Sequence, residues 1–235
     1  GIGHVYASEY CSDDQAIDRL DQYAKHNLTA AYSGPIEPRI IKFDPGHRAV
    51  FWHRNCVAIG MAAGFIEPLE ASALVMVELS AAMIAEQMPP TRAAMDPIAR
   101  RFNKKFLYRW RSIINFLKLH YLLSERTNHR YWVDQRASST VPEDLLELLS
   151  IWQYQTPWHR DQEHVDELFP TASYQYILYG MQFNTMQNDH YRQKNKTSAE
   201  ATLNKRQEYT TKLYRALPDH RELIAAIAKQ GLPKF

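Results

Sequence analysis

The sequence has 235 residues, of which 45% are hydrophobic and 23% are charged, and its formal net charge is +2 at pH 7. These fractions are ordinary for a globular protein and argue against an intrinsically disordered chain. A net charge so close to zero gives no strong electrostatic attraction to nucleic acid. The chain is long enough to bury one large hydrophobic core or two modest ones.

The two cysteines, Cys11 and Cys56, make neither a disulfide framework nor a metal-binding spacing, and the ten histidines show no metal-ligand spacing. We expect Cys56 to be a small buried apolar residue. Neither a signal peptide nor an apolar stretch long enough to span a bilayer is evident. The composition therefore predicts a cytoplasmic protein that binds no metal, no nucleic acid and no membrane.

The first 90 residues alternate between strand and helix patterns. Residues 3–8 predict a strand, and residues 12–15 are a capping-box pattern that begins a helix. The apolar face of this helix is expected to consist of Ile17, Leu20, Tyr23 and Ala24. Residues 39–43 and 47–52 flank the sequence Asp44-Pro-Gly46 and predict a β-hairpin. An apolar run at residues 56–59 predicts a buried strand, and a long apolar helix is expected at about residues 71–88.

After the break at Pro89-Pro90 the pattern is helical almost throughout. Apolar residues at spacings of three and four predict one long amphipathic helix, whose face consists of Phe102, Phe106, Trp110, Ile113, Leu117 and Tyr121. The opposite face carries Arg100, Lys104, Lys105, Arg111 and Lys118. We interpret these charges as a solvated helix face rather than a nucleic-acid site.

The rest of the chain predicts shorter elements. A helix runs from Pro142 to Trp152, followed by a polar connector at residues 156–167 and an aromatic stretch at residues 169–183. Residues 184–197 predict a polar loop, and two short helices at about residues 198–216 and 219–230 close the chain.

The segment from Asn55 to Ala73 is the most informative part of the sequence. The apolar run ends at Gly60, and Glu67 and Glu70 then precede the long helix. A strand, a glycine turn and a helix N-terminus together point backbone N–H groups at a ligand, and the helix dipole favours negative charge there. The two carboxylates could equally be plain helix-start acids, worth about 0.3–1 kcal/mol each. From the residues alone both interpretations stay open.

The residues Asn55-Cys-Val-Ala-Ile-Gly60, followed by Gly64-Phe-Ile-Glu-Pro-Leu-Glu-Ala-Ser72, resemble the signature of the flavin-dependent tryptophan halogenases. Residues 1–10 resemble the strand that follows that family's Trp-x-Trp-x-Ile-Pro motif, and residues 132–180 and 217–223 resemble its C-terminal region. A Gly-x-Gly-x-x-Gly fingerprint is absent because Tyr6 stands where the third glycine would fall. The family's Trp-x-Trp-x-Ile-Pro motif and catalytic lysine are absent too. The resemblance therefore implies the C-terminal portion of a halogenase.

This resemblance implies an α/β (α+β) fold class with two parts. Residues 1–90 would be the C-terminal part of an incomplete FAD-binding, monooxygenase-like domain, and residues 91–235 a mainly α-helical, substrate-binding lobe. In the family, reduced FAD, oxygen and chloride or bromide yield hypohalous acid, which halogenates an aromatic, indole- or tryptophan-like substrate. A separate flavin reductase supplies the reduced FAD, and a homodimer is an open possibility. We expect the chain alone to be inactive.

Two alternatives stay open beside this interpretation. The first is a related FAD-dependent aromatic monooxygenase that hydroxylates its substrate. The second is a non-catalytic helical module that binds a partner.

The resemblance also assigns roles to residues. Glu70 matches the catalytic glutamate, since halogenation of an aromatic ring needs a carboxylate to stabilise the cationic intermediate or accept its proton. Glu67 is expected to be structural. The resemblance places the FAD ring beside Gly60, Pro68, Leu69 and Ala71. It places the halide at Ser72 and Ala73, because an anion needs N–H donors and a positive dipole.

The candidate substrate residues are Tyr174, Gln175 and Trp132. Tryptophan-specific members carry two adjacent tyrosines, and here Tyr174 matches the first and Gln175 the second. The aromatic cluster around them could hold an indole ring, or it could simply pack in the core. The glutamine favours a different indole, a phenol, or a larger substrate such as a peptide.

Overall fold

The computed structural model describes residues 2–27, 37–161, 167–186 and 189–232. Its contacts divide the chain into two units, Gly1–Thr185 and Met186–Phe235. The first unit holds all the strands and most of the helices of the described residues, and its longest element is α3 (Arg92–Leu122). Within those residues no helix combines the length and the apolar character that crossing a bilayer requires.

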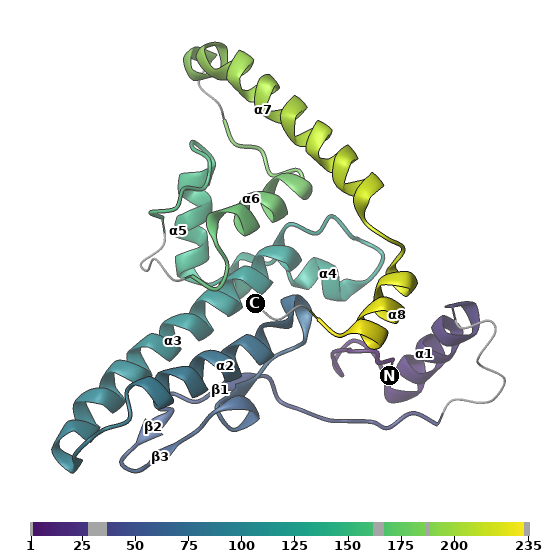
Figure 1. Ribbon diagram of the computed structural model, residues 1–235. Helices are drawn as coiled ribbons and strands as arrows, with labels where there is room; N and C mark the ends of the chain where they lie inside the picture. The colour runs from purple at the N-terminus through teal and green to yellow at the C-terminus, as the bar shows by residue number, and fades with distance from the viewer. Residues whose placement is uncertain (1, 28–36, 162–166, 187–188, 233–235) are drawn as a thin grey trace. The chain divides into compact units, whose positions relative to one another are not determined.

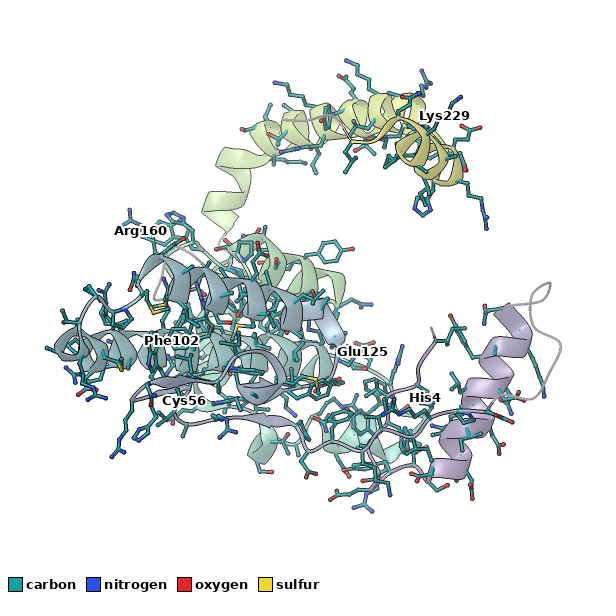
Figure 2. The ribbon with its side chains drawn as sticks, turned by 60° about the horizontal axis from the view of Figure 1, so that its bottom comes forward. His4, Cys56, Phe102, Glu125, Arg160 and Lys229 are labelled. Atoms are coloured by element: carbon teal, nitrogen blue, oxygen red, sulfur yellow. The ribbon has the colours of Figure 1, made fainter. Side chains whose placement is uncertain are left out.

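The long amphipathic helix predicted around residues 102–121 is confirmed as α3 (Figure 1). The Thr91 side chain accepts a hydrogen bond from the backbone N–H of Ala94 and so caps its first turn. Five of the six predicted core positions are buried, and Tyr121 is half-buried. Phe102, labelled in Figure 2, stacks on Phe106 with ring centroids 4.3 Å apart.

Helix α2 (Ser72–Glu86) confirms the apolar helix expected after residue 70. It ends just before Pro89-Pro90, where the chain turns, so that α2 and α3 run side by side in opposite directions (Figure 1). The start of α2 therefore lies near the end of α3. This arrangement places the segment at residues 67–72 against the last turns of α3.

Helices α4 (Arg130–Asp134), α5 (Glu143–Trp152) and α6 (Thr171–Gly180) follow α3, and both α5 and α6 pack against it. The predicted helix from Pro142 to Trp152 is confirmed as α5. Two aromatic contacts of Phe116 join α3 to this part of the chain. Its ring stacks on Phe169 at 4.0 Å and meets Tyr174 edge-on at 4.9 Å.

The strands are shorter and pair differently from the prediction. Strand β1 (Gly46–His47) pairs with β4 (Gly64–Phe65), and β2 (Trp52–His53) pairs with β3 (Cys56–Val57), both antiparallel. The predicted hairpin around Asp44-Pro-Gly46 is therefore wrong, since no pairing joins residues 39–43 to residues 47–52. The chain turns at Arg54, which has φ 53°, and at Asn55.

One side chain of α3 binds the backbone at the start of β2. The Asn103 side-chain oxygen accepts hydrogen bonds from the backbone N–H groups of Phe51 and Trp52, at 2.9 and 2.8 Å. Its amide nitrogen donates to the Trp52 carbonyl at 2.9 Å. Because Asn103 takes the place of a neighbouring strand, β2 is fixed on α3 instead of extending a larger sheet.

Two further predictions for this region are wrong. Residues 3–8 form no strand, and Cys56 is exposed rather than buried (Figure 2). The run at residues 56–59 is a strand only at Cys56–Val57, with one residue exposed and the other half-buried. A two-strand ribbon has one face toward α3 and one toward solvent, so an apolar run in it need not be buried.

The capping box at residues 12–15 is confirmed. The Ser12 N–H donates to the Gln15 side chain and the Gln15 N–H donates to the Ser12 hydroxyl oxygen, both at 3.2 Å. Helix α1 (Asp13–Asn27) follows, but Ala16 and Ala24 are its buried residues, so the predicted apolar face is only partly right. Before the helix, the Tyr10 hydroxyl donates to the Asp134 carboxylate of α4 at 2.9 Å.

Lys118 was expected on the solvated face of α3 and is instead buried. Its ammonium group donates to the Gln135 carbonyl, the Gln135 side-chain oxygen and the Thr140 hydroxyl oxygen, at 2.7, 2.9 and 2.8 Å. Three acceptors compensate for its removal from water, although burial still lowers the pKa of this ammonium group. Lys118 thereby holds the segment between α4 and α5 on α3.

The second unit contains α7 (Asp189–Ala216) and α8 (His220–Gln230). The polar loop predicted at residues 184–197 is wrong from residue 189 onward, because α7 already begins there. The final helix is confirmed, and the Asp219 side chain caps it by accepting from the Arg221 N–H at 2.8 Å. All described side chains of residues 196–232 are exposed.

Helices dominate this fold, and the strands of the described residues are four two-residue segments. The α/β character of the predicted class is therefore confined to residues 46–65. The contacts place residues 1–185 in one unit because α3 packs against elements on both sides of residue 90. The predicted division at residue 90 separates a cofactor-binding part from a substrate-binding part. This functional division stays a prediction.

We predict that Gly64→Ala destabilises the first unit. A Cβ atom at Gly64 would lie 2.7 Å from Trp110 Cζ2 and 2.8 Å from the Gly46 carbonyl oxygen. Since backbone atoms cannot yield easily, we expect a loss of about 1–3 kcal/mol in the free energy of unfolding, measured by urea titration. The matched control is Gly180→Ala, where a Cβ would meet nothing within 4 Å. Equal stability of the two variants would contradict this packing.

Candidate active site at the start of α2

The candidate site is a left-handed turn that leads into α2. It lies in the short helical turn η2 (Leu69–Ala71), where Glu70 has φ 65° and ψ 7° and Ala71 has φ 49° and ψ 29°. For residues other than glycine this conformation costs about 1–2 kcal/mol each. Two successive strained residues persist only where the surroundings fix them, and such strain is concentrated at functional sites.

The end of α3 fixes this turn through two carboxylates. His120 Nε2 lies 3.0 Å from Glu70 Oε1, and the Tyr121 hydroxyl donates to Glu67 Oε1 at 3.0 Å. In the first pair the His120 side chain is mostly covered, with 15% of it exposed, whereas 35% of the Glu70 side chain is exposed to solvent. Consecutive residues of α3 thus hold both glutamates of the predicted signature.

Tyr121 is a neutral donor in this arrangement. Burial raises the pKa of its hydroxyl group, and the negative charge of Glu67 raises it further. The pKa of Tyr131 is also raised, chiefly by burial. The Tyr121 ring contacts both Tyr131, edge-on at 6.0 Å, and Trp132 at 6.1 Å. An aromatic cluster therefore surrounds the hydrogen bond to Glu67.

The N-terminus of α2 carries no side-chain cap. The residue at the cap position is Ala71, and its own N–H donates to the Pro68 carbonyl at 3.1 Å. The next N–H groups belong to Ser72 and Ala73, in the first turn of the helix. A left-handed residue followed by a right-handed one forms a concave nest of N–H groups that binds anions. This donor set fits a halide ion.

The predicted cofactor residues lie beside this helix start. Gly60, with φ 58°, begins the short helical turn η1 (Gly60–Ala62), and both η1 and η2 contact α2. Leu69 is 36% exposed, and Met61 and Leu74 are among the most exposed apolar side chains of the chain. Exposed apolar side chains beside backbone N–H donors fit a flavin ring, which has apolar faces and a polar edge.

The predicted substrate residues are less accessible to solvent than the predicted cofactor residues. Tyr174 is buried and packs against Phe116 and against Trp152, at 4.9 and 5.3 Å. The Gln175 side-chain nitrogen donates to the Pro157 carbonyl at 2.8 Å. Trp132 is half-buried, and the Arg126 guanidinium lies over its ring at 4.7 Å. Each of these side chains thus has a structural contact, and the roles assigned to them in substrate binding stay predictions.

Sequence reasoning assigned His120 no part in the site. Its Nδ1 contacts the Phe116 carbonyl four residues earlier in α3, at 2.8 Å. Its partner Glu70 is 50 positions away in sequence. No periodic pattern links two such positions, so only the fold brings them together.

Comparison with known proteins identifies the family. The family model described as tryptophan halogenase matches residues 1–197. The chain belongs to the tryptophan halogenase family. The resemblance noted in the sequence is thereby confirmed.

Individual relatives agree with this assignment. Tryptophan 6-halogenase SttH from Streptomyces toxytricini is 32% identical over 184 residues, which are 77% of this chain and 33% of that protein. The crystal structure of a tryptophan halogenase from Shewanella frigidimarina NCIMB 400 is 44% identical with a TM-score of 0.90, and the match covers 99% of this chain and 44% of that one.

A third similar protein is BrvH, a flavin-dependent halogenase from Brevundimonas sp. BAL3. Its structure is 29% identical with a TM-score of 0.77, and the match covers 95% of this chain and 43% of that one. This halogenase-family chain therefore spans between a third and a half of the length of these relatives.

We predict that Ala71→Gly stabilises the chain. Glycine removes the left-handed penalty of about 1–2 kcal/mol at φ 49° and adds about 0.5–1 kcal/mol of backbone entropy cost. The expected net gain is about 0.5–1 kcal/mol in the free energy of unfolding, measured by urea titration. The control is Ala82→Gly, at an exposed position inside α2, which should lose about 0.5–1 kcal/mol. Equal losses in both variants would refute the left-handed turn.

We also predict that Tyr121→Phe changes how stability depends on alkaline pH. The folded-state pKa of Tyr121 lies above its unfolded value of 10.0, so its contribution is complete below that pH and is lost as the pH rises further. At about pH 8 the variant should lose about 1.5–3 kcal/mol with the hydrogen bond to the Glu67 carboxylate.

The check is urea unfolding at about pH 8 and about pH 11, where the variant should show a smaller alkaline loss than the original chain. Tyr176→Phe, at a side chain that is 79% exposed, is the control and should change neither value. An equal alkaline loss with and without the Tyr121 hydroxyl would be the contrary result.

Proposed function

We propose that this chain supplies the halide site and the catalytic glutamate of a flavin-dependent halogenase that chlorinates or brominates an aromatic, indole- or tryptophan-like substrate. The observation that carries the proposal is the turn at Glu70–Ala71, which brings a held carboxylate next to an uncapped helix N-terminus. Membership of the family supports it. The reduced FAD would come from a separate flavin reductase.

The halide would bind at the first turn of α2. The backbone N–H groups of Ser72 and Ala73 are the donors, and the positive end of the helix dipole adds to their attraction. Ser72 is buried, so an ion held there would be shielded from competing water. These N–H groups could bind either chloride or bromide.

The flavin ring would lie against the residues that border this helix start, namely Gly60, Pro68, Leu69 and Ala71. When bound, the reduced FAD supplies the activation of oxygen that converts halide into hypohalous acid. The chain's own contribution is to bind the ring on apolar side chains and to hold the halide beside it.

Glu70 would act on the substrate. As hypohalous acid transfers its halogen to a ring carbon, the oxygen–halogen bond breaks and the oxygen leaves as hydroxide. That carbon's C–H electron pair then returns to the aromatic ring and the proton passes to the carboxylate, from which it can convert the hydroxide to water. Oε1 of Glu70 is held by His120, so the other oxygen is the one available to accept the proton. The carboxylate also stabilises the positive charge of the intermediate.

The aromatic substrate would lie on the side of Trp132 and the segment around Tyr174. Gln175 stands where tryptophan-specific members have a second tyrosine, and its amide is already bonded to Pro157. We therefore propose an indole, a phenol or an aromatic side chain of a peptide rather than free tryptophan alone.

We predict that Glu70→Gln in the complete gene product lowers kcat for halogenation by about 10²–10⁴-fold, because the amide cannot accept the proton. The assay supplies reduced FAD from a reductase, oxygen, chloride or bromide and an indole panel, with mass spectrometry of the products. Glu78→Gln, at an exposed position of α2, is the control and should keep the original rate.

Two results would contradict the proposal. Full halogenation by the Glu70→Gln variant would remove the catalytic role from this residue. A hydroxylated product without halogen, made by the original protein, would identify an aromatic monooxygenase instead.

A further inference from the structure

We propose that His120 is the positioning residue of Glu70, and that the two side chains form an imidazolium–carboxylate pair whose single proton holds the carboxylate in its working orientation. This inference rests on the function proposed above for its catalytic consequence, but the pair itself can be tested without turnover. It assigns a role to a residue that touches Glu70 rather than the substrate.

The geometry requires a proton on each ring nitrogen. Nδ1 of His120 lies 2.8 Å from the Phe116 carbonyl oxygen, which can only accept, so Nδ1 carries a hydrogen. Nε2 lies 3.0 Å from Glu70 Oε1. If Nε2 were bare, its lone pair would face a carboxylate oxygen, and both atoms would be acceptors. With Glu70 ionised, the contact is therefore favourable only when the ring is doubly protonated.

The neighbouring groups offer no second charged partner to His120. Glu67 is held by the Tyr121 hydroxyl at 3.0 Å, and burial keeps the pKa values of Tyr121 and Tyr131 raised, so both stay neutral. The Phe116 ring contacts the imidazole edge-on at 5.0 Å and carries no charge. Among the described residues, no other ionisable side chain is recorded in contact with His120.

A held carboxylate matters because Glu70 is otherwise a flexible side chain on a strained turn. A general base must lie within hydrogen-bond reach of the proton that it accepts, and a displacement of about 1 Å can cost about 10²-fold in rate. When alkaline pH removes the shared proton, the His120 lone pair repels Glu70 Oε1. Halogenation should then decline on the alkaline side with the titration of this pair.

The kinetic experiment uses two substitutions in the complete gene product. His120→Phe removes every polar contact with Glu70, and we expect kcat to fall about 10–100-fold with a nearly unchanged KM for the aromatic substrate. His120→Gln can still donate to Glu70 Oε1 but has no proton to lose. We expect it to retain more activity and to lose the alkaline decline.

Tyr121→Phe is the matched control, because it breaks the neighbouring bond to Glu67 and leaves the His120 contact intact. It should keep the alkaline decline of the original enzyme. A role of His120 in folding alone would not alter the shape of the pH profile, so this measurement separates positioning from stability.

The second experiment needs no turnover. Nitrogen-15 NMR of the 235-residue chain should show both His120 ring nitrogens protonated at neutral pH. In Glu70→Gln the amide NH₂ can donate to Nε2, so the ring should become the neutral tautomer with its hydrogen on Nδ1.

The outcomes separate this inference from the proposed function. A bare Nε2 in the original chain, or a full alkaline decline in His120→Gln, would overturn the pair. If NMR shows the doubly protonated ring and the complete protein makes no halogenated product, the pair stands and the halogenase assignment fails.

Discussion

The last turn of α3 is the constraint on which the candidate site depends. Its side chains His120 and Tyr121 hold Glu70, within the turn that leads into α2, and Glu67, just before that turn. Further back on the same helix, Asn103 fixes β2 and Trp110 packs against Gly64. One helix of 31 residues therefore aligns the ribbons, the turn and the start of α2. These contacts with α3 give the short sequence motif at residues 67–72 a defined geometry.

The turn itself stores strain that these contacts offset. Two left-handed residues cost about 2–4 kcal/mol together, and hydrogen bonds to the two carboxylates contribute about 1.5–3 kcal/mol each. These magnitudes are similar, so the strained conformation is sustainable while both contacts exist. The result is a carboxylate at Glu70 and the first N–H groups of α2, at Ser72 and Ala73, within four consecutive residues, an arrangement that a helix with an ordinary side-chain cap does not provide.

Local patterns predicted the local features of this fold. Spacings of three and four predicted α3, an apolar stretch predicted α2, and the capping box predicted the start of α1, because each depends on residues close together in the sequence. Three expectations were wrong: a hairpin in place of the β1–β4 pairing, a buried Cys56 and a solvated Lys118. The observed features depend on partners far away in sequence. The turn at Glu70 was found through its motif, whereas His120 was missed because its partner lies 50 residues away.

The His120 proton also resolves an electrostatic conflict within the proposed site. A halide at the N–H groups of Ser72 and Ala73 would lie close to the carboxylate of Glu70. Two negative unit charges about 5 Å apart repel by about 3 kcal/mol at an effective dielectric constant of about 20. A protonated His120 on Glu70 Oε1 makes the pair neutral overall, so most of that repulsion disappears and the helix dipole can attract the anion. The same proton that orients the base thereby allows base and halide to occupy adjoining positions.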